Sequence, residues 1–280
     1  MKLGFVTCVK LGLSCMEAIY RAGGELAFAM TLPDDSACTK SGRVYIDDFC
    51  TKNGIPLLKS SNVNNPDVVE AIKMAGLDWL FIVGWSQIAK DQVLKAPLRG
   101  LLGMHPTLLP EGRGRAAIPW AILRELPKTG VTLFKMDAGV DAGPIAMQVE
   151  ITLSPTTSAT KLYEQVDSAH IELINKAIPL IYSDGLTLQE QDHSAATVWL
   201  GRKPEDGKID LAGSIYEAER LIRAVTHPYP GAYYDFDNIR HIVWAAEIAQ
   251  VGAILQGSYL RFSDGILIIK DYSIRPIIGS

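Results

Sequence analysis

The chain has 280 residues, of which 48% are hydrophobic and 21% charged, and its formal net charge at pH 7 is −4. This composition is ordinary for a folded protein with a buried core, and the length suits one large and one small domain. The negative charge argues against a large polyanionic partner such as nucleic acid, apart from a local basic patch. The first residues lack the features of a signal peptide and the longest apolar run is too short to span a bilayer, so we expect a cytoplasmic protein.

The first half of the chain predicts a regular alternation of strands and helices. Short apolar runs predict buried strands at 3–7, 26–32 and 79–83. Capping residues, glycines and prolines delimit predicted helices at 15–22, 45–53 and 66–74, with Ser14 as the N-cap of the first. The alternation continues to about residue 150 and is typical of a doubly wound α/β sheet, which binds ligands at the carboxyl ends of its strands.

The second half predicts a long helix, a connector and a small β-rich region. The amphipathic segment 160–181 predicts the long helix, and the polar segment 183–203 reads as the connector. A shorter helix is predicted at 214–224, and the predicted strands that follow it are 242–248, 258–262 and 265–270. We therefore expect a catalytic domain at 1–200 and a small β-barrel-like domain at 201–280, whose strands offer a surface for a possible homodimer.

Two common classes of site are not supported by the sequence. Neither a Gly-x-Gly-x-x-Gly motif after the first strand nor a Walker A motif occurs, which disfavours a dinucleotide enzyme and a phosphate-loop NTPase. The four cysteines (Cys8, Cys15, Cys38 and Cys50) form no Cys-x-x-Cys pair. We expect them to be reduced, buried side chains, and we expect no metal site.

Residues that carry chemistry concentrate in two segments. Segment 100–115 ends a predicted strand at His105 and continues into a loop rich in proline, glycine and arginine. Segment 131–145 is a predicted strand followed by a glycine-rich turn that carries Asp137 and Asp141. Loops on a rigid sheet often bear catalytic groups. Because a histidine beside proline and an Asp-x-Gly turn are also ordinary structural features, residue types alone leave both interpretations open.

Taken together, the two segments resemble the folate-dependent formyltransferase family. The resemblance rests on His-Pro-x-Leu-Leu-Pro-x-x-Arg-Gly from His105 and on Gly-Val-Thr-x-x-x-Met-Asp-x-Gly-x-Asp-x-Gly from Gly130. It extends to segments 32–34 and 84–88, and the segments 204–210 and 227–232 resemble the longer, two-domain members. The resemblance implies a Rossmann-like N-terminal domain that binds 10-formyltetrahydrofolate and a smaller C-terminal β domain.

The resemblance also implies a catalytic set of asparagine, histidine and aspartate. His105 and Asp141 match the last two, but Gly103 stands where the family has the asparagine. Loss of one donor to the developing oxyanion costs about 3 kcal/mol or more. Three possibilities follow: protonated His105 acts alone, Gln87 or Ser86 supplies the donor, or the chain is a slow or inactive homologue. In an active enzyme, Asp141 would orient the imidazole and help to move the proton of the attacking amine.

Other functional residues follow from the same resemblance. The residues expected to bind the folate are Trp85, Ile88, Thr107, Leu108, Leu109, Pro110, Met136, Asp137 and Val140. Core packing is an equally good interpretation of Trp85. Gln87, Arg113 and Arg115 are candidates for binding the substrate, and the two arginines suit phosphate or carboxylate groups. Solvated surface positions are the alternative for both arginines.

The acceptor of the formyl group is expected to be a nucleotide-linked amino sugar. Methionyl-tRNA is the alternative, but segment 34–43 carries only two cations against two acids, whereas a tRNA enzyme should have a basic insertion there. Segment 204–210 and the turn at His227 look more like those of sugar-modifying relatives. A homologue that binds folate and hydrolyses it, or has little activity, is the third hypothesis.

Overall fold

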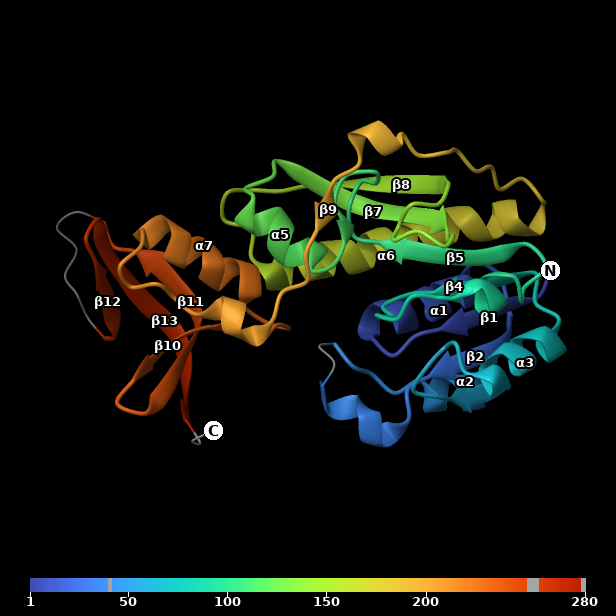
Figure 1. Cartoon of the computed structure of the whole chain (residues 1–280), viewed down its shortest axis with the longest axis horizontal. Helices are drawn as coiled ribbons and strands as arrows, with labels where there is room; N and C mark the ends of the chain where they lie inside the picture. Colours follow the sequence, from blue (N-terminus) through green and yellow to red (C-terminus); the bar gives the residue numbers. More distant parts are fainter. Residues whose placement is uncertain (40–41, 251–256, 278–280) are drawn as a thin grey trace. The chain divides into compact units, whose positions relative to one another are not determined.

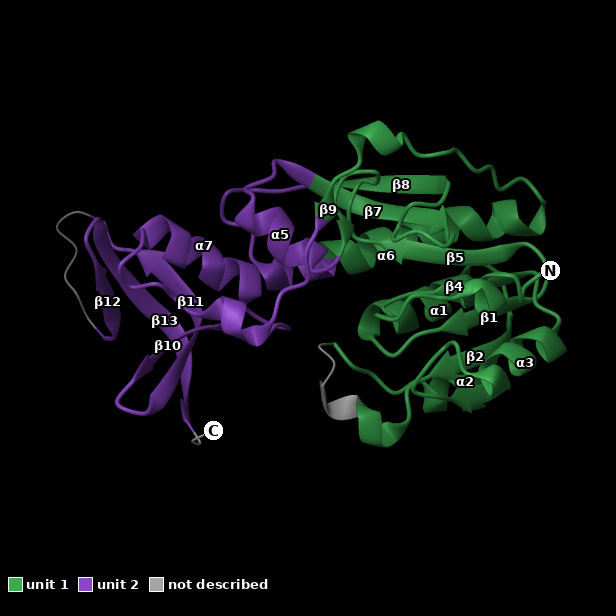
Figure 2. Cartoon of the chain, viewed as in Figure 1, with its two compact units in different colours: residues 1–114, 129–151, 165–198 green, residues 115–128, 152–164, 199–280 purple. Residues whose placement is uncertain are grey.

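A computed structural model describes residues 1–39, 42–250 and 257–277 of the chain. The chain divides into two compact units (Figure 2), which are described separately. The first consists of residues 1–114, 129–151 and 165–198, and the second of residues 115–128, 152–164 and 199–280. The second unit thus includes two segments that precede the domain boundary expected near residue 200.

The first unit is built on a seven-stranded sheet in the order β3-β2-β1-β4-β5-β7-β8 (Figure 1). The strands are β1 (Leu3–Val6), β2 (Leu26–Thr31), β3 (Leu57–Lys59), β4 (Trp79–Ile82), β5 (Gly100–His105), β7 (Lys128–Lys135) and β8 (Ile145–Thr152). Strands β1 to β5 pair in parallel, whereas β7 runs antiparallel to β5. The predicted doubly wound α/β class is confirmed. Strands β2 and β3 are added on one side of β1 and strands β4 and β5 on the other, so the strand order reverses between β1 and β4.

Helices connect the parallel strands. They are α1 (Lys10–Arg21), α2 (Asp47–Asn53), α3 (Pro66–Ala75) and α4 (Asp91–Leu94), and the long α6 (Ala159–Tyr182) follows β8. Short 3-10 helices span Asp34–Thr39 and His193–Ala195. The core between these layers is apolar, and the rings of Phe5 in β1 and Phe81 in β4 stack with centroids 5.7 Å apart. The burial of such side chains supplies most of the stability of a sheet of this kind.

The prediction for the start of α1 was wrong. The helix begins at Lys10, and Ser14, expected as its N-cap, is a buried residue whose Oγ donates to Asp167 Oδ2 at 3.2 Å. Its first turn is held by a distant segment, since the Lys10 N–H donates to the Gly42 carbonyl at 2.8 Å. A tertiary contact here replaces the side-chain cap that a sequence pattern can reveal.

The second unit contains a four-stranded antiparallel sheet in the order β10-β11-β13-β12. Its strands are β10 (Ala232–Phe236), β11 (Ile239–Ile248), β12 (Tyr259–Phe262) and β13 (Gly265–Pro276), and its helices are α5 (Ala117–Leu123), α7 (Ile215–Val225) and a 3-10 helix at Pro204–Gly207. The small C-terminal β domain is confirmed. Two-residue strands β6 (Arg113–Gly114) and β9 (Val198–Trp199) complete the structure. Within the described ranges, no helix has both the length and the apolar character needed to cross a membrane.

Candidate active site

His105 and Asp141 meet in the first unit, although they come from different parts of the sequence. His105 is the last residue of β5 and is buried, and Asp141 lies in the loop that joins β7 to β8. The distance from His105 Nδ1 to Asp141 Oδ2 is 3.5 Å. This distance is short enough for an ion pair but longer than a good hydrogen bond. The two residues predicted to be catalytic are therefore adjacent.

The second ring nitrogen of His105 also faces an oxygen. His105 Nε2 lies 2.8 Å from the Gly112 carbonyl. A neutral imidazole donates from only one nitrogen, so the ring can donate to both oxygens only when it carries two protons. The site thus holds the imidazole between a fixed main-chain acceptor and a carboxylate, an arrangement that accommodates positive charge on the ring.

Asp141 is fixed by contacts from outside its own loop. Its φ of 51° lies in the left-handed region, which aspartate tolerates better than most residues. Its Oδ2 accepts the Gly114 N–H at 2.9 Å, and its carbonyl accepts a hydrogen bond from Gln191 Nε2, also at 2.9 Å. The position of this carboxylate is therefore set by segments that lie both before and after it in the chain.

The two arginines proposed as substrate ligands have different environments. Arg113 is buried, and its Nε and Nη2 donate to Gln191 Oε1 at 3.2 and 2.6 Å. Its Nη2 also lies 3.0 Å from His193 Nδ1. Arg115 is exposed and belongs to the second unit. Nε and Nη2 of Arg113 therefore join chain segments, and a role of Arg113 in binding the substrate stays a prediction.

Apolar side chains occupy the space beside Gly103, where the family has its asparagine. Gly103 pairs with Phe134 across β5 and β7. An ideal Cβ at position 103 would lie 3.0 Å from Met136 Cγ and from Phe134 Cε1 and Cζ. This is tighter than ordinary contact, so an asparagine would fit only if these neighbours moved.

Gln87, one possible source of the missing donor, is used to shape its own loop. Its Oε1 accepts the Val63 N–H at 3.0 Å and Trp85 Nε1–H at 3.2 Å, and its Nε2 donates to the Ser61 carbonyl at 2.6 Å. Ser86, the other possible source, is exposed. Because an amide nitrogen carries two N–H groups, the hydrogen bond to Ser61 leaves Gln87 a second N–H that can donate to a substrate.

The residues expected to bind folate divide into buried and exposed groups. Thr107 and Leu109 are buried, while Trp85 and Met136 are partly buried and pack against the apolar core under β4. Ile88 and Val140 are large apolar side chains that remain 62% and 50% exposed. The remaining residues of this set are the half-buried Leu108 and Pro110 and the exposed Asp137, whose Oδ1 accepts the Gly139 N–H.

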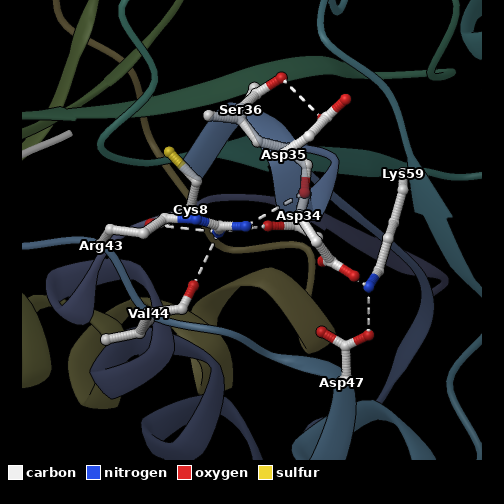
Figure 3. Close-up of polar contacts among 10 residues, drawn as sticks. Cys8, Asp34, Asp35, Ser36, Arg43, Val44, Asp47 and Lys59 are labelled. Carbon is white, nitrogen blue, oxygen red and sulfur yellow. Dashed lines mark hydrogen bonds and ion pairs between the residues drawn. The ribbon is translucent and has the colours of Figure 1, made fainter. Parts of the chain in front are cut away.

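The carboxyl ends of β1 and β2 are closed by the chain itself (Figure 3). Nη1 of Arg43 donates to the carbonyls of Cys8 and Val44, and Nη2 donates to the Leu32 carbonyl. Lys59 bridges Asp34 and Asp47 nearby. Segment 42–44 thus covers the end of β1 and the start of α1, where a dinucleotide-binding fold receives phosphate. This arrangement agrees with the missing glycine motif.

A second histidine near the site was not singled out by the sequence. His170 of α6 is buried, and its Nδ1 lies 2.7 Å from the Val166 carbonyl. Burial, reinforced by the charge of nearby His105 and partly offset by the Val166 hydrogen bond, lowers the pKa of His170 to about 4. His170 is therefore neutral at neutral pH.

The described cysteines are buried, reduced thiols: Cys8, Cys15 and Cys50. The side chain of Cys38 lies outside the described part of the chain. Burial, together with the charge of Asp47, raises the pKa of the Cys50 thiol to about 11, and burial and Asp167 raise the pKa of Cys15. Such thiols are poor nucleophiles and poor metal ligands.

Comparisons with known proteins agree with this fold. The family model described as formyl transferase matches residues 24–178, more than half of the chain, and the model of the formyl transferase C-terminal domain matches residues 202–271. The structure is similar to methionyl-tRNA formyltransferase from Clostridium thermocellum (18% identity, 99% of each chain covered, TM-score 0.65).

It is also similar to the N-formyltransferase from Helicobacter canadensis determined with folinic acid and dTDP-3-aminofucose (17% identity, 98% of each chain, TM-score 0.67). A third similar structure is HypX from Aquifex aeolicus (15% identity, 99% of this chain and 48% of that chain, TM-score 0.70). At these identities the solved structures support the fold alone. The two family matches confirm the resemblance inferred from the motifs around His105 and Asp141, and the chain belongs to the formyl transferase family.

Proposed function

We propose that this enzyme transfers the formyl group of 10-formyltetrahydrofolate to the amine of a nucleotide-linked amino sugar. The observation that carries the proposal is the 3.5 Å approach of His105 Nδ1 to Asp141 Oδ2, at the end of β5. An imidazole and a carboxylate in contact can exchange a proton with a reacting amine. The family match supplies the type of reaction.

Two features of the residues expected to bind the folate support this proposal. Ile88 and Val140 leave large apolar surfaces exposed, which the ring system of a ligand can cover. The buried Thr107 Oγ1 is without a hydrogen-bond partner within the described structure. The residues that would hold the folate are Trp85, Ile88, Thr107, Leu108, Leu109, Pro110, Met136, Asp137 and Val140. When bound, 10-formyltetrahydrofolate supplies an activated formyl group.

His105 and Asp141 would transfer the proton and stabilise the charge that develops in the reaction. As the amine nitrogen bonds to the formyl carbon, the bond from that carbon to N10 of the folate breaks. Asp141 Oδ2 can accept the proton that the attacking amine loses, and that proton then goes to N10 as it leaves. The imidazole, held by the Gly112 carbonyl, presents its charge to the oxygen that becomes negative. Because apolar side chains fill the space beside Gly103, we propose that His105 supplies this stabilisation without an amide at that position.

The charge distribution favours a small acceptor over tRNA. Arg43, one of the two cations in segment 34–43, points inward to main-chain carbonyls, and Lys59 is paired with Asp34 and Asp47. The Nη atoms of Arg43 and the Lys59 ammonium are thus engaged within the chain and offer little to RNA phosphates. The Helicobacter canadensis structure, determined with dTDP-3-aminofucose, gives a suitable first substrate.

An acceptor panel tests the proposal. The purified enzyme is incubated with 10-formyltetrahydrofolate and dTDP-3-aminofucose, methionyl-tRNA or no amine, and the products are identified by mass spectrometry. We expect formylation of the amino sugar and slow consumption of the folate without an amine. Formylation of methionyl-tRNA alone would replace the proposed acceptor, and fast consumption without any amine would indicate a hydrolase.

A further inference from the structure

Gln191 is a buried residue that the sequence assigns only to a polar connector. It lies between α6 and β9, and its side chain is 5% exposed. All of its polar atoms are used. Nε2 donates to the carbonyls of Asp141 and Gly143 at 2.9 and 2.7 Å, and Oε1 accepts two hydrogen bonds from Arg113. A buried amide with every group satisfied is held in one orientation.

The amide nitrogen and the amide oxygen of Gln191 each make hydrogen bonds to one of the two segments that orient the catalytic pair. Its Nε2 holds the main chain at Asp141. Its Oε1 holds Arg113, which lies between Gly112, the acceptor for His105 Nε2, and Gly114, the donor to Asp141 Oδ2. One side chain therefore connects the support of the carboxylate with the support of the imidazole.

The geometry of the pair makes such support necessary. The distance of 3.5 Å between His105 Nδ1 and Asp141 Oδ2 is too long for a strong hydrogen bond, so the pair does not hold itself together. Asp141 also has a left-handed φ of 51°, which is uncommon for a residue other than glycine. Both features persist only when the surrounding structure fixes the loop.

We infer that Gln191 is a positioning residue for formyl transfer, which holds the Asp141 carboxylate against the His105 imidazole through its amide N–H groups. Arg113 orients the Gln191 side chain and therefore affects the catalytic pair only through Gln191. This inference rests on the proposed catalytic role of His105 and Asp141. A displacement of about 1 Å in such a site can lower a rate about 100-fold.

Substitution Gln191→Glu separates positioning from packing. The carboxylate has the same shape and keeps an acceptor for Arg113, but it loses both donors to the Asp141 loop. Gln189→Ala is the matched control, because Gln189 is exposed in the same connector and its main chain, which the substitution keeps, makes the hydrogen bonds to Ile145. If Gln191→Glu fails to fold, Arg113→Lys replaces it, since lysine keeps the charge but cannot make both hydrogen bonds to Gln191 Oε1 from a planar fork.

Two measurements are made on each variant. The first is kcat and KM for transfer from 10-formyltetrahydrofolate to dTDP-3-aminofucose. The second is the NMR resonance of the His105 ring in histidine-labelled protein, assigned with His105→Ala. We expect Gln191→Glu to lower kcat by about 10- to 100-fold, with KM for the folate changed by less than about 3-fold. We expect the His105 resonance to move in the same direction as in Asp141→Asn, and Arg113→Lys to show a smaller change of the same kind.

Wild-type kcat and an unmoved His105 resonance in Gln191→Glu, or in Arg113→Lys as its substitute, would overturn the inference. A failure of the proposed function would look different, because His105→Ala and Asp141→Asn would then transfer formyl groups at the wild-type rate. The resonance requires no substrate, so it decides the inference even when another amine is the acceptor.

Discussion

At the scale of single residues, Gly103 is packed by apolar neighbours where the family has an asparagine. A side chain at this position would fit only if Phe134 and Met136 moved, because their atoms lie 3.0 Å from the place of a Cβ. The glycine and the aromatic ring face each other across β5 and β7, a pairing in which the ring covers the exposed backbone. The apolar filling is therefore part of the packing of this sheet.

We expect Gly103→Asn to destabilise the protein by about 1–3 kcal/mol, because the new side chain overpacks the space beside Phe134. Phe134→Leu should reduce this cost, so the double variant should be more stable than the sum of the single effects predicts. Urea unfolding of the three variants measures the coupling. Strictly additive effects would show that position 103 and Phe134 do not compete for space.

His170 gives a prediction for acid stability. Its pKa is about 4 in the folded protein, below the ordinary histidine value of about 6.5, so the unfolded chain binds the proton more strongly. The contribution of His170 to stability is thus present above about pH 6.5 and is lost as pH falls towards 4, with a maximum on the order of 3 kcal/mol. His170→Gln should lose less stability between about pH 7.5 and about pH 5 than wild type in urea unfolding. Equal losses would contradict this origin of acid sensitivity, and replacement of the exposed His227 serves as the control.

The meeting of His105 and Asp141 could be predicted from the sequence, but the residues that support this pair could not. His105 and Asp141 lie in motifs with fixed spacing, and the structure brings them together. Gln191 lies in a polar segment without periodicity, where no local pattern indicates burial or a long-range contact. Arg113 was assigned to substrate by its residue type, yet its partners are Gln191 and His193. Contacts between distant segments decide such roles.

At the scale of elements, capping residues in the sequence predicted a helix correctly where a side chain close in sequence caps it. The predicted helix at 214–224 corresponds to α7, and Ser214 Oγ accepts the Tyr216 N–H at 3.2 Å. The start of α1 was mispredicted because a distant segment holds it. Strand β10 was missed although Asp237 and Asn238, both with positive φ, join it to β11 as a two-residue hairpin loop. Such loops are a recognisable signal between alternating runs.

We expect Ser214→Ala to lower the free energy of unfolding by about 1 kcal/mol, the usual cost of losing an N-cap. The loss includes the hydrogen bond that Ser214 Oγ donates to Asp264 Oδ2 at 2.8 Å. Urea denaturation measures the change, and Ser61→Ala at an exposed serine is the control. An unchanged midpoint in Ser214→Ala would show that the cap does not stabilise α7.

At the scale of the whole molecule, the net charge and the location of the proposed site favour a small acceptor over tRNA. The net charge of −4 offers no large cationic field, and the proposed pair with its supports lies within the first compact unit. We expect kcat/KM for a nucleotide-linked amino sugar to fall less than about 10-fold between about 50 and 200 mM salt, because few phosphates are bound. A loss of about 1000-fold, as expected for a polyanion held through many phosphates, would point instead to tRNA. Steady-state kinetics at the two salt concentrations distinguish these outcomes.

The central claim is that His105 and Asp141 act as one catalytic unit, and a double-mutant cycle in formyl transfer tests it most directly. Kinetics of His105→Ala, Asp141→Asn and the double variant are compared, with circular dichroism and unfolding as checks on the fold. We expect His105→Ala to lower kcat by at least about 100-fold, and the double variant to be scarcely slower than His105→Ala alone. Near-wild-type kcat in His105→Ala, or independent effects that multiply in the double variant, would contradict it.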